Sequence, residues 1–367
     1  AGAAAAAARR PAGGRRPRPA GPAARARRQP AAGPQDRRRR QPVRRHRPRH
    51  RPGHPMNRLP ILIDTDPGQD DAVALLLAAA SPELELLGVT TVAGNVPLAL
   101  TTLNARKVLE LAGRADVPIC AGADRPLDVP LVTAEHVHGD TGLNGVELPE
   151  PTLPVDPRHA VDFIVQTLRE REPGTVTLCP LGPLTNIALA LRQAPDIATR
   201  IRRIVLMGGG FFEGGNVTPA AEFNFYVDPQ AAHEVFTSGV SITMAPLDVT
   251  HEVLTTAARI AAIRALPNRV GQVVAAWMEF FERYDEEKYG QDGGPLHDPC
   301  VIAFLLKPEL FTSRECNVRI ETQSPLTRGM SVIDWWAVTG LPANAQVLRH
   351  ADADGFFALL TERLARL

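Results

Sequence analysis

Cysteine is scarce in this chain, and the few cysteines form no recognisable site. The 367 residues include four, at Cys120, Cys179, Cys300 and Cys316, and no two of them have a CxxC spacing. This scatter argues against a zinc site. It favours reduced thiols, mostly in the core of a cytoplasmic protein.

Long hydrophobic runs are also absent. Apolar stretches such as 72–80 are too short to span a bilayer, and no secretory hydrophobic region precedes them. We therefore expect a cytoplasmic protein with no membrane partner.

The first 55 residues lack aromatic side chains and consist almost entirely of Ala, Gly, Pro and Arg. They contain 17 Arg and one acid, Asp36, so this tail carries a charge of +16. Because the whole chain has a formal net charge of +1, the remainder carries −15. The near-neutral total conceals a basic tail and an acidic body. Such a tail cannot bury enough apolar surface to fold, so we expect it to be disordered.

The role of the tail stays open between three interpretations. Arginine runs attract phosphate groups, as in nucleic-acid binding, and a transit peptide also has abundant Arg and few acids. The chain starts with Ala, however, and Met56 lies directly before the first strand pattern. We expect residues 1–55 to be a dispensable extension or a start assigned too far upstream. Residues 56–367 then form the functional domain, which needs no nucleic acid.

Strand and helix patterns alternate through this domain. Apolar or β-branched runs predict strands at 59–63, 86–92, 117–121, 175–179, 201–207 and 240–245. Helical patterns are expected at 71–80, 98–111, 160–171, 184–191, 229–238 and across 254–289. The alternation is typical of right-handed βαβ units. We therefore predict the α/β class, with a mostly parallel, doubly wound, Rossmann-like sheet, flanking helices and a ligand crevice at the carboxyl ends of the strands.

The most specific motif is the run Asp64-Thr-Asp-Pro-Gly-Gln-Asp-Asp71. Its four carboxylates cannot all stay ionised in a pocket without a cation. Helix capping would satisfy Asp70 and Asp71, but it does not account for two more acids at the end of a buried strand. All-oxygen ligands suit a hard cation, calcium or magnesium.

Two later segments are weaker signals when taken alone. His297 and Asp298 lie between prolines and could supply a titratable group and a further carboxylate ligand. The glycine-rich stretch after 201–207 fails the dinucleotide pattern G-x-G-x-x-G because Glu213 occupies the last glycine position. The acid Glu222 farther along would repel a phosphate, so the polar residues here fit sugar hydroxyls better.

Together these segments resemble the inosine/uridine-preferring nucleoside hydrolase family, from about residue 60 to the C-terminus. The resemblance rests on motifs that occur in the family's order: Asp64-Thr-Asp-Pro-Gly-Gln-Asp-Asp-Ala72, Val92-Ala-Gly-Asn95, His138-Gly-Asp-Thr-Gly-Leu143, Pro180-Leu-Gly-Pro-Leu-Thr-Asn186, Met207-Gly-Gly-Gly210, Ala221-Glu-Phe-Asn224 and His297-Asp-Pro299. It implies calcium-dependent hydrolysis of the N-glycosidic bond of ribonucleosides in nucleoside salvage, by a homodimer or homotetramer. The basic tail is no part of the family pattern.

The resemblance also implies roles for individual residues. The calcium ligands would be Asp66, Asp71, Asp298 and the backbone carbonyl of Leu181. Asp66 would deprotonate a calcium-bound water, and His297 would donate a proton to the leaving base. The remaining pocket residues would contact the ribose (Asp70, Asn216, Glu222, Asn224), line the same pocket (Asn95, Met207) or face the base (His138).

This chemistry agrees with the residue types. Carboxylates stabilise the positive charge that develops on the sugar when an N-glycosidic bond breaks, and a histidine can protonate the departing base. The segment before His297 offers Phe281, Tyr284, Asp285 and Tyr289, which favour a pyrimidine or broad preference without deciding it.

Parts of the sequence also fit two other functions. A haloacid-dehalogenase-type phosphatase would use Asp64 as a nucleophile and needs a phosphate-binding lysine, but none of the three lysines, Lys107, Lys288 and Lys307, follows a strand end. A non-catalytic module could bind ribose through calcium, and it would leave Asp66 and His297 without catalytic roles.

Overall fold

The computed structural model describes residues 58–289 and 293–367, with side chains described outside 282–289. Residues 1–55, for which the sequence predicts disorder, lie outside the described part of the chain, so that expectation stays a prediction. The side chains of Tyr284, Asp285 and Tyr289 are also outside it.

A nine-stranded sheet forms the centre of the domain, in the order β3-β2-β1-β4-β5-β6-β9-β7-β8. The strands from β3 to β9 in this order pair in parallel, whereas β7 pairs antiparallel with both β9 and β8. Their bounds are β1 Leu59–Thr65, β2 Leu84–Thr91, β3 Ile119–Ala121, β4 Val176–Pro180, β5 Ile201–Met207, β6 Ile242–Ala245, β7 Phe311–Ile320, β8 Ser331–Asp334 and β9 Ala345–Ala351. The predicted α/β class with a mostly parallel sheet is confirmed.

Helices cover both faces of this sheet. Their bounds are α1 Gln69–Ala79, α2 Leu98–Leu111, α3 Glu135–His138, α4 Ala160–Glu170, α5 Thr185–Gln193, α6 Phe223–Val227, α7 Pro229–Thr237, α8 Leu247–Thr250, α9 Ala257–Arg264, α10 Arg269–Tyr289, α11 Pro299–Leu306 and α12 Ala353–Leu364. Short 3₁₀ helices span Pro195–Thr199 and Pro308–Leu310.

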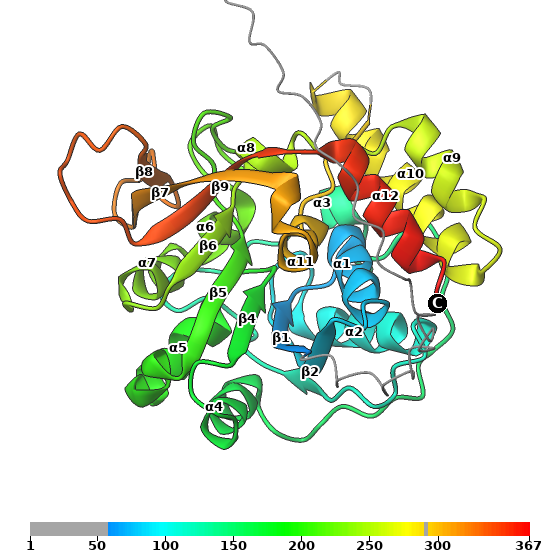
Figure 1. Cartoon of the computed structure of the whole chain (residues 1–367), viewed down its shortest axis with the longest axis horizontal. Coiled ribbons are helices and arrows are strands. Elements are labelled where there is room, and N and C mark those ends of the chain that lie inside the picture. Colours follow the sequence, from blue (N-terminus) through cyan, green and yellow to red (C-terminus); the bar gives the residue numbers. More distant parts are fainter. Residues whose placement is uncertain (1–57, 290–292) are drawn as a thin grey trace, which may run out of the picture. The chain divides into compact units, whose positions relative to one another are not determined.

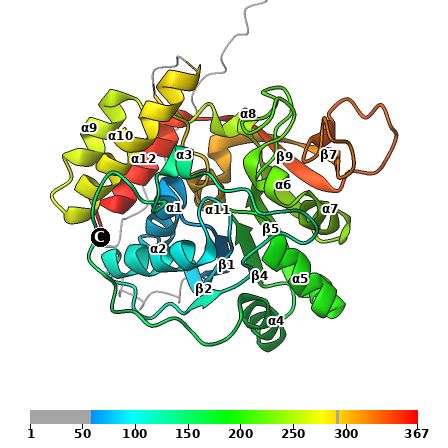
Figure 2. The same ribbon diagram turned by 180° about the vertical axis from the view of Figure 1, so that it is seen from behind.

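Each face of the sheet buries its own apolar core. In β1, Ile61 and Ile63 point to one face and Leu62 points to the other, because successive side chains of a strand alternate. Helices α1, α2, α10, α11 and α12 pack on the first face, and α4, α5 and α7 pack on the second. Figures 1 and 2 show these two helical layers from opposite sides. The buried sheet holds the strand ends, and hence the site, in fixed positions.

Two expectations about the second half of the chain were incomplete. The helical region expected across 254–289 is two helices, α9 and α10, which are separated near Pro267. Proline cannot donate a helical hydrogen bond, and the Asn268 side chain accepts from the N–H of Gly271 to start the second helix. The antiparallel strands β7 and β8 and the returning strand β9 were not predicted.

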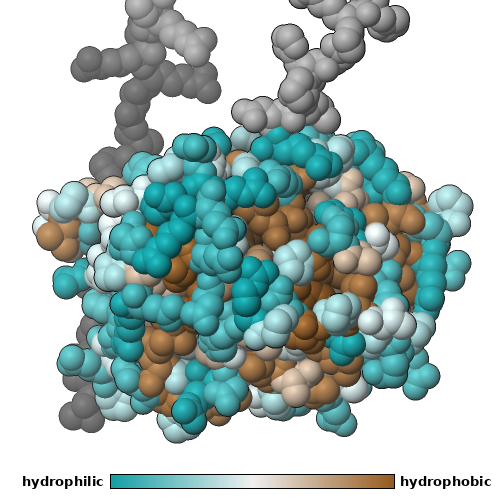
Figure 3. All heavy atoms as spheres, turned by 90° about the horizontal axis from the view of Figure 1, so that it is seen from below, coloured by the Kyte–Doolittle hydropathy of each residue, from teal (hydrophilic) through white to brown (hydrophobic). Residues whose placement is uncertain are grey.

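The surface mixes polar and apolar side chains. On the face shown in Figure 3, apolar residues reach the surface at several places between hydrophilic ones. Most large apolar side chains that are exposed in the described ranges belong to the segment 326–341: Leu326, Val332, Trp336, Val338 and Leu341. Within the same ranges, every helix is too short or too polar to cross a bilayer.

Candidate active site

The first turn of α1 holds the centre of the site. Asp70 and Asp71 lie in this turn, and both are buried. The Asp71 carboxylate accepts hydrogen bonds from the N–H of Gly68 at 3.0 Å, from the Asn95 side-chain amide at 3.1 Å and from the Thr65 hydroxyl. These donors and the helix N-terminus favour the ionised form, but burial raises the pKa of Asp71 above its usual value.

Asp66 follows β1 and is enclosed by two glycines. Its Oδ2 accepts from the N–H of Asn95 at 2.7 Å, whereas its Oδ1 is buried with no hydrogen-bond partner among the described residues. A Cβ atom on Gly94 or Gly182 would overlap the Asp66 carboxylate. These loops must therefore be glycine at both positions to leave room for the side chain. An unsatisfied buried carboxylate oxygen is costly and indicates a missing partner.

Asp298 reaches the same place from the start of α11. Carboxylate oxygens of Asp70, Asp71 and Asp298 all lie within 4.8 Å of one another, and all three side chains are buried. Desolvation and the charges of Asp70 and Asp71 raise the pKa of Asp298 well above its usual range, and burial raises that of Asp70 to about 7. Such a group of acids is stabilised by a cation, and its all-oxygen donors fit a hard divalent ion.

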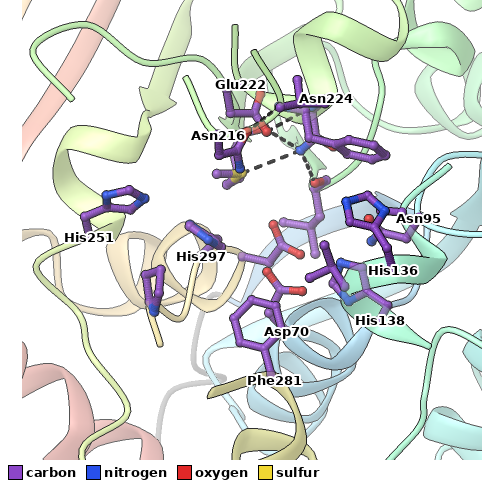
Figure 4. Close-up of a pocket in the computed structure, with 18 residues that line it drawn as sticks. Asp70, Asn95, His136, His138, Asn216, Glu222, Asn224, His251, Phe281 and His297 are labelled. Carbon is purple, nitrogen blue, oxygen red and sulfur yellow. Dashed lines mark hydrogen bonds between the residues drawn. The ribbon is translucent and has the colours of Figure 1, made fainter. Parts of the chain in front are cut away.

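Polar groups from two other strand ends form a second wall of the cleft. Glu222 is the N-cap of α6 and accepts from the N–H groups of Gly209 at 2.8 Å and Asn224 at 2.9 Å. Burial raises the pKa of Glu222 to about 7. The Asn224 side-chain amide donates to the carbonyls of Leu181 at 2.7 Å and Met207 at 3.3 Å (Figure 4). Asn216 accepts from the N–H of Phe223 at 3.0 Å.

Aromatic and imidazole rings form the third wall. Phe281 stacks on His138 with ring centroids 5.7 Å apart, and its ring lies edge-on to His297 at 6.4 Å. His251 also lines the cleft, with its ring centroid 5.7 Å from that of His297. Burial lowers the pKa of His138 to about 3 and that of His297 well below its usual value. These rings are therefore neutral in the cleft without ligand.

The three walls line one cleft, which is open to solvent. In Figure 4, Asn216, Glu222 and Asn224 lie together on one side of the cleft with Asp70 across from them, and histidine rings lie on both flanks. This arrangement matches a molecule with hydroxyl groups at one end and a flat ring at the other.

Comparison with known proteins decides the family. The model of the inosine-uridine preferring nucleoside hydrolase family matches residues 61–358. The chain belongs to this family. It is therefore an N-glycosidase of the ribonucleoside hydrolase class.

The chain matches its relatives over nearly the whole of their length. An uncharacterized protein of Schizosaccharomyces pombe is 59% identical over 307 residues, which is 84% of this chain and 99% of that protein. The pyrimidine-specific ribonucleoside hydrolase RihA of Photobacterium profundum is 52% identical over 308 residues, 83% of this chain and 98% of the relative. The solved purine-preferring ribonucleoside hydrolase of Gardnerella vaginalis is 32% identical, with a TM-score of 0.78 over 83% of this chain and 98% of that one.

The nucleoside hydrolase cleft brings together the residues that the motifs singled out. Those that line it are Asp70, Asn95, His138, Leu181, Met207, Asn216, Glu222, Asn224, His297 and Asp298. Asp66 and Asp71 lie beneath its floor, each 1% exposed. Asp71 and Asp298, two of the predicted metal ligands, lie within 4.8 Å of Asp70, a predicted ribose contact. The ligand roles of Asp66, Asp71 and Asp298 stay predictions.

Four residues at the ring end of the cleft received no role from the sequence. His136 and His251 line the cleft, and Gln69 and Thr250 hydrogen-bond to its other histidines. Gln69 lies inside the acidic motif and His136 lies two residues before His138, so both were close to a recognised signal. Nothing in the local sequence around Thr250 and His251 marks them.

Proposed function

We propose that this nucleoside hydrolase is calcium-dependent and prefers pyrimidine ribonucleosides. The observation that carries the calcium proposal is the buried group Asp70, Asp71 and Asp298 beside the unsatisfied Oδ1 of Asp66. Carboxylates at a protein interior need a cation, and calcium accepts the six to eight oxygen ligands that acids, a carbonyl and sugar hydroxyls can supply. The proposed ligands are Asp66, Asp71, Asp298 and the Leu181 carbonyl.

The ion, when bound, would orient the ribose hydroxyls and lower the pKa of the attacking water. Asp66 is the proposed base that accepts a proton from this water. The proposed ribose contacts are Asp70, Asn216, Glu222 and Asn224, and Asn95 and Met207 are proposed to line the same pocket. Their acidic members also favour the positive charge that develops on the sugar as the bond to the base breaks.

His138 and His297 are proposed to face the base, with His297 donating a proton to it. The ring of His297 is neutral when the cleft is empty, because burial lowers its pKa. Negative charge that develops on the departing base raises the proton affinity of a nearby histidine, so the ring is suited to this step once substrate is bound. The electron pair of the broken bond goes to the base, and the water oxygen bonds to the sugar carbon.

The preference for pyrimidines is supported by the relatives rather than by the cleft. The relative named pyrimidine-specific is 52% identical, whereas the purine-preferring solved structure is 32% identical. Release of reducing sugar from uridine, cytidine, inosine and adenosine by the full chain tests the proposal. Faster release from uridine and cytidine is expected, and faster release from inosine and adenosine would overturn the pyrimidine preference.

The geometry argues against a haloacid-dehalogenase-type phosphatase. Asp64, the nucleophile that a phosphatase would need, is fully buried and accepts hydrogen bonds from the Thr90 hydroxyl and the Asn186 amide. It does not line the cleft. Burial raises its pKa to about 7, which further weakens it as a nucleophile.

A homodimer or homotetramer and a cytoplasmic location complete the proposal. The exposed apolar side chains of the segment 326–341 support self-association, and four buried free thiols suit a reducing compartment. Light scattering coupled to size-exclusion chromatography tests the oligomer. A monomer mass at micromolar concentration would contradict it.

A further inference from the structure

A hairpin at the end of the sheet contacts the backbone that holds Glu222. Strands β7 and β8 are the last two in the sheet order (Figure 1), and they pair antiparallel with Ile320 opposite Ser331. Leu326 and Trp336 on this hairpin are exposed, whereas Ser331 is only 1% exposed. The buried side of the hairpin therefore differs in its contacts from the exposed side.

The hydroxyl of Ser331 binds both backbone groups of one residue in the glycine-rich loop, which spans residues 208–216. It accepts a hydrogen bond from the N–H of Gly210 at 2.9 Å and donates one to the carbonyl of the same residue at 2.7 Å. A hydroxyl has one proton and two acceptor sites, so it can make both bonds at once. Since Gly210 is buried, removing the hydroxyl would deprive both backbone groups of this partner, and the loop would have to move to find new ones.

The glycine-rich loop also holds the carboxylate of Glu222. The N–H of Gly209 donates to Glu222 Oε2 at 2.8 Å. From α6, the N–H groups of Asn224 and Phe225 donate to the same carboxylate at 2.9 and 3.2 Å. Glu222 is 2% exposed and lines the cleft, so the direction of its carboxylate depends on these three donors. One donor belongs to the loop and the other two belong to α6.

The same hairpin packs against α6. Gly329 lies so close to this helix that a Cβ atom there would be 2.7 Å from the backbone of Tyr226 and 3.2 Å from the Ala221 side chain. Arg328 lies over the Tyr226 ring, 4.9 Å from its centroid. The hairpin thus contacts both of the backbone segments whose N–H groups hold Glu222.

The next residues of the glycine-rich loop are fixed by a second buried side chain. Asp248 is 2% exposed, and its carboxylate accepts from the N–H groups of Phe211 at 2.7 Å and Phe212 at 2.8 Å. The Trp335 ring, directly after β8, lies 6.4 and 5.9 Å from the rings of these two residues. Every backbone N–H from 208 to 212 therefore has an acceptor among the described residues. In such a loop, a displacement of one residue is passed to the next.

We infer that Ser331 is a positioning residue for ribose binding, because it fixes the glycine-rich loop and thereby the direction of the Glu222 carboxylate. Ser331 is not one of the residues that line the cleft, so it acts through the loop rather than by touching substrate. This inference rests on the proposed contact of Glu222 with ribose. It gives the inward side of the β7–β8 hairpin a role in substrate binding.

Amide hydrogen exchange of the full chain, followed by ¹⁵N NMR, tests these contacts without any need for turnover. In Ser331→Ala, the Gly210 amide loses its acceptor, and the Gly209 amide should lose protection with it. We expect both amides to exchange about tenfold faster than in the unmodified protein. Unchanged exchange at Gly209 would overturn the inference, whether or not the protein releases ribose.

A matched control variant is available at the end of α1. Ser81 is 3% exposed, and its hydroxyl donates to the Leu77 carbonyl at 2.7 Å. Ser81→Ala makes the same chemical change at a buried serine away from the cleft, and it should leave the exchange of Gly209 and Gly210 unchanged. Equal acceleration in Ser81→Ala and Ser331→Ala would show general loosening of the fold and would also overturn the inference.

Kinetics on deoxynucleosides separate ribose positioning from general damage. We expect Ser331→Ala to lower kcat/KM for uridine by about tenfold. The loss should be much smaller for one of the three analogues 2′-, 3′- and 5′-deoxyuridine, namely the one that lacks the hydroxyl held by Glu222. Equal losses on uridine and all three analogues would show a structural role and overturn the inference. Absence of ribose release from every substrate would instead contradict the proposed function and leave the exchange result standing.

Discussion

Carboxyl oxygens of Asp71 and Asp298 lie within 4.8 Å of each other, although the two residues come from different helices far apart in the sequence. Two buried carboxylates this close repel each other, and a cation between them would remove the repulsion. This proximity joins the first turn of α1 to the start of α11 and closes the floor of the cleft.

Neutralising one of these acids should weaken calcium binding without unfolding the protein. Asp298→Asn keeps the size of the side chain and removes a charge, so we expect calcium affinity to fall by about tenfold or more. Isothermal titration with calcium measures the affinity. Asp354→Asn, at an exposed acid on α12, is the control and should bind calcium as the unmodified protein does. Equal affinities for all three proteins would place the ion elsewhere.

Gly182→Ala should remove activity by displacing Asp66. The added methyl group would overlap the Asp66 carboxylate, so we expect kcat to fall by at least about a hundredfold. Gly174→Ala is the matched control, because a Cβ there meets open space and only its positive φ of 73° is strained. That variant should lose about 1–2 kcal/mol of stability and keep its kcat. Full activity of Gly182→Ala would show that Asp66 has no fixed position in the reaction.

The cleft should discriminate strongly between ribose and deoxyribose. A 2′-deoxynucleoside lacks one hydroxyl that the proposed ion and the buried polar groups would hold, and those groups would stay unpaired. We expect kcat/KM for 2′-deoxyuridine to be lower than that for uridine by about a hundredfold or more. Equal turnover of the two substrates would contradict the proposed ribose contacts.

Phe281→Ala should impair base binding. Phe281 is 5% exposed and stacks on His138, so its removal takes away the stacking partner of that ring and opens a cavity. We expect stability to fall by about 3 kcal/mol and KM for uridine to rise. Phe280→Ala on the same helix is the control, because this side chain contacts Gly145 rather than the cleft. If Phe281→Ala left KM unchanged and Phe280→Ala raised it, the result would contradict the proposed position of the base beside Phe281.

Glu222 should make stability depend on pH. Burial raises its folded pKa to about 7 from a usual value of 4.5, so the folded state holds a proton that the unfolded state has lost between these values. Stability in the presence of a chelator should therefore fall as pH rises from about 4.5 to 7, by up to roughly 3 kcal/mol from this group. Denaturant unfolding at several pH values measures the fall, which Glu222→Gln should reduce. If stability fell equally in the unmodified protein and in Glu222→Gln, the pH dependence would come from other acids.

Local pattern predicted the parallel half of the sheet well. The expected helix at 98–111 and strand at 201–207 coincide with α2 and β5, because each has a clear apolar period and a clear stop. The antiparallel strands were missed because β7 has four consecutive exposed residues, so the alternation that identifies a half-buried strand is interrupted. Its pairing with β9 and β8 depends on contacts between distant segments.

Some residues of the candidate site could likewise be predicted from local sequence, and others could not. Asp66, Asp71 and Asp298 could be selected because an acidic run and a His-Asp pair are visible in the sequence. The contact of Gln69 with two carbonyls and the contact of Thr250 with His297 join segments far apart in the chain. No local pattern in the sequence reports such contacts, so they become visible only in the fold.

The central claim is tested most directly by ribose release from uridine, measured with the full chain before chelation, after chelation and after calcium is added back. The account predicts that chelation abolishes release and that calcium restores it. Release that continues unchanged with the metal removed would contradict the calcium-dependent mechanism. No release under any of the three conditions would contradict the proposed activity on uridine.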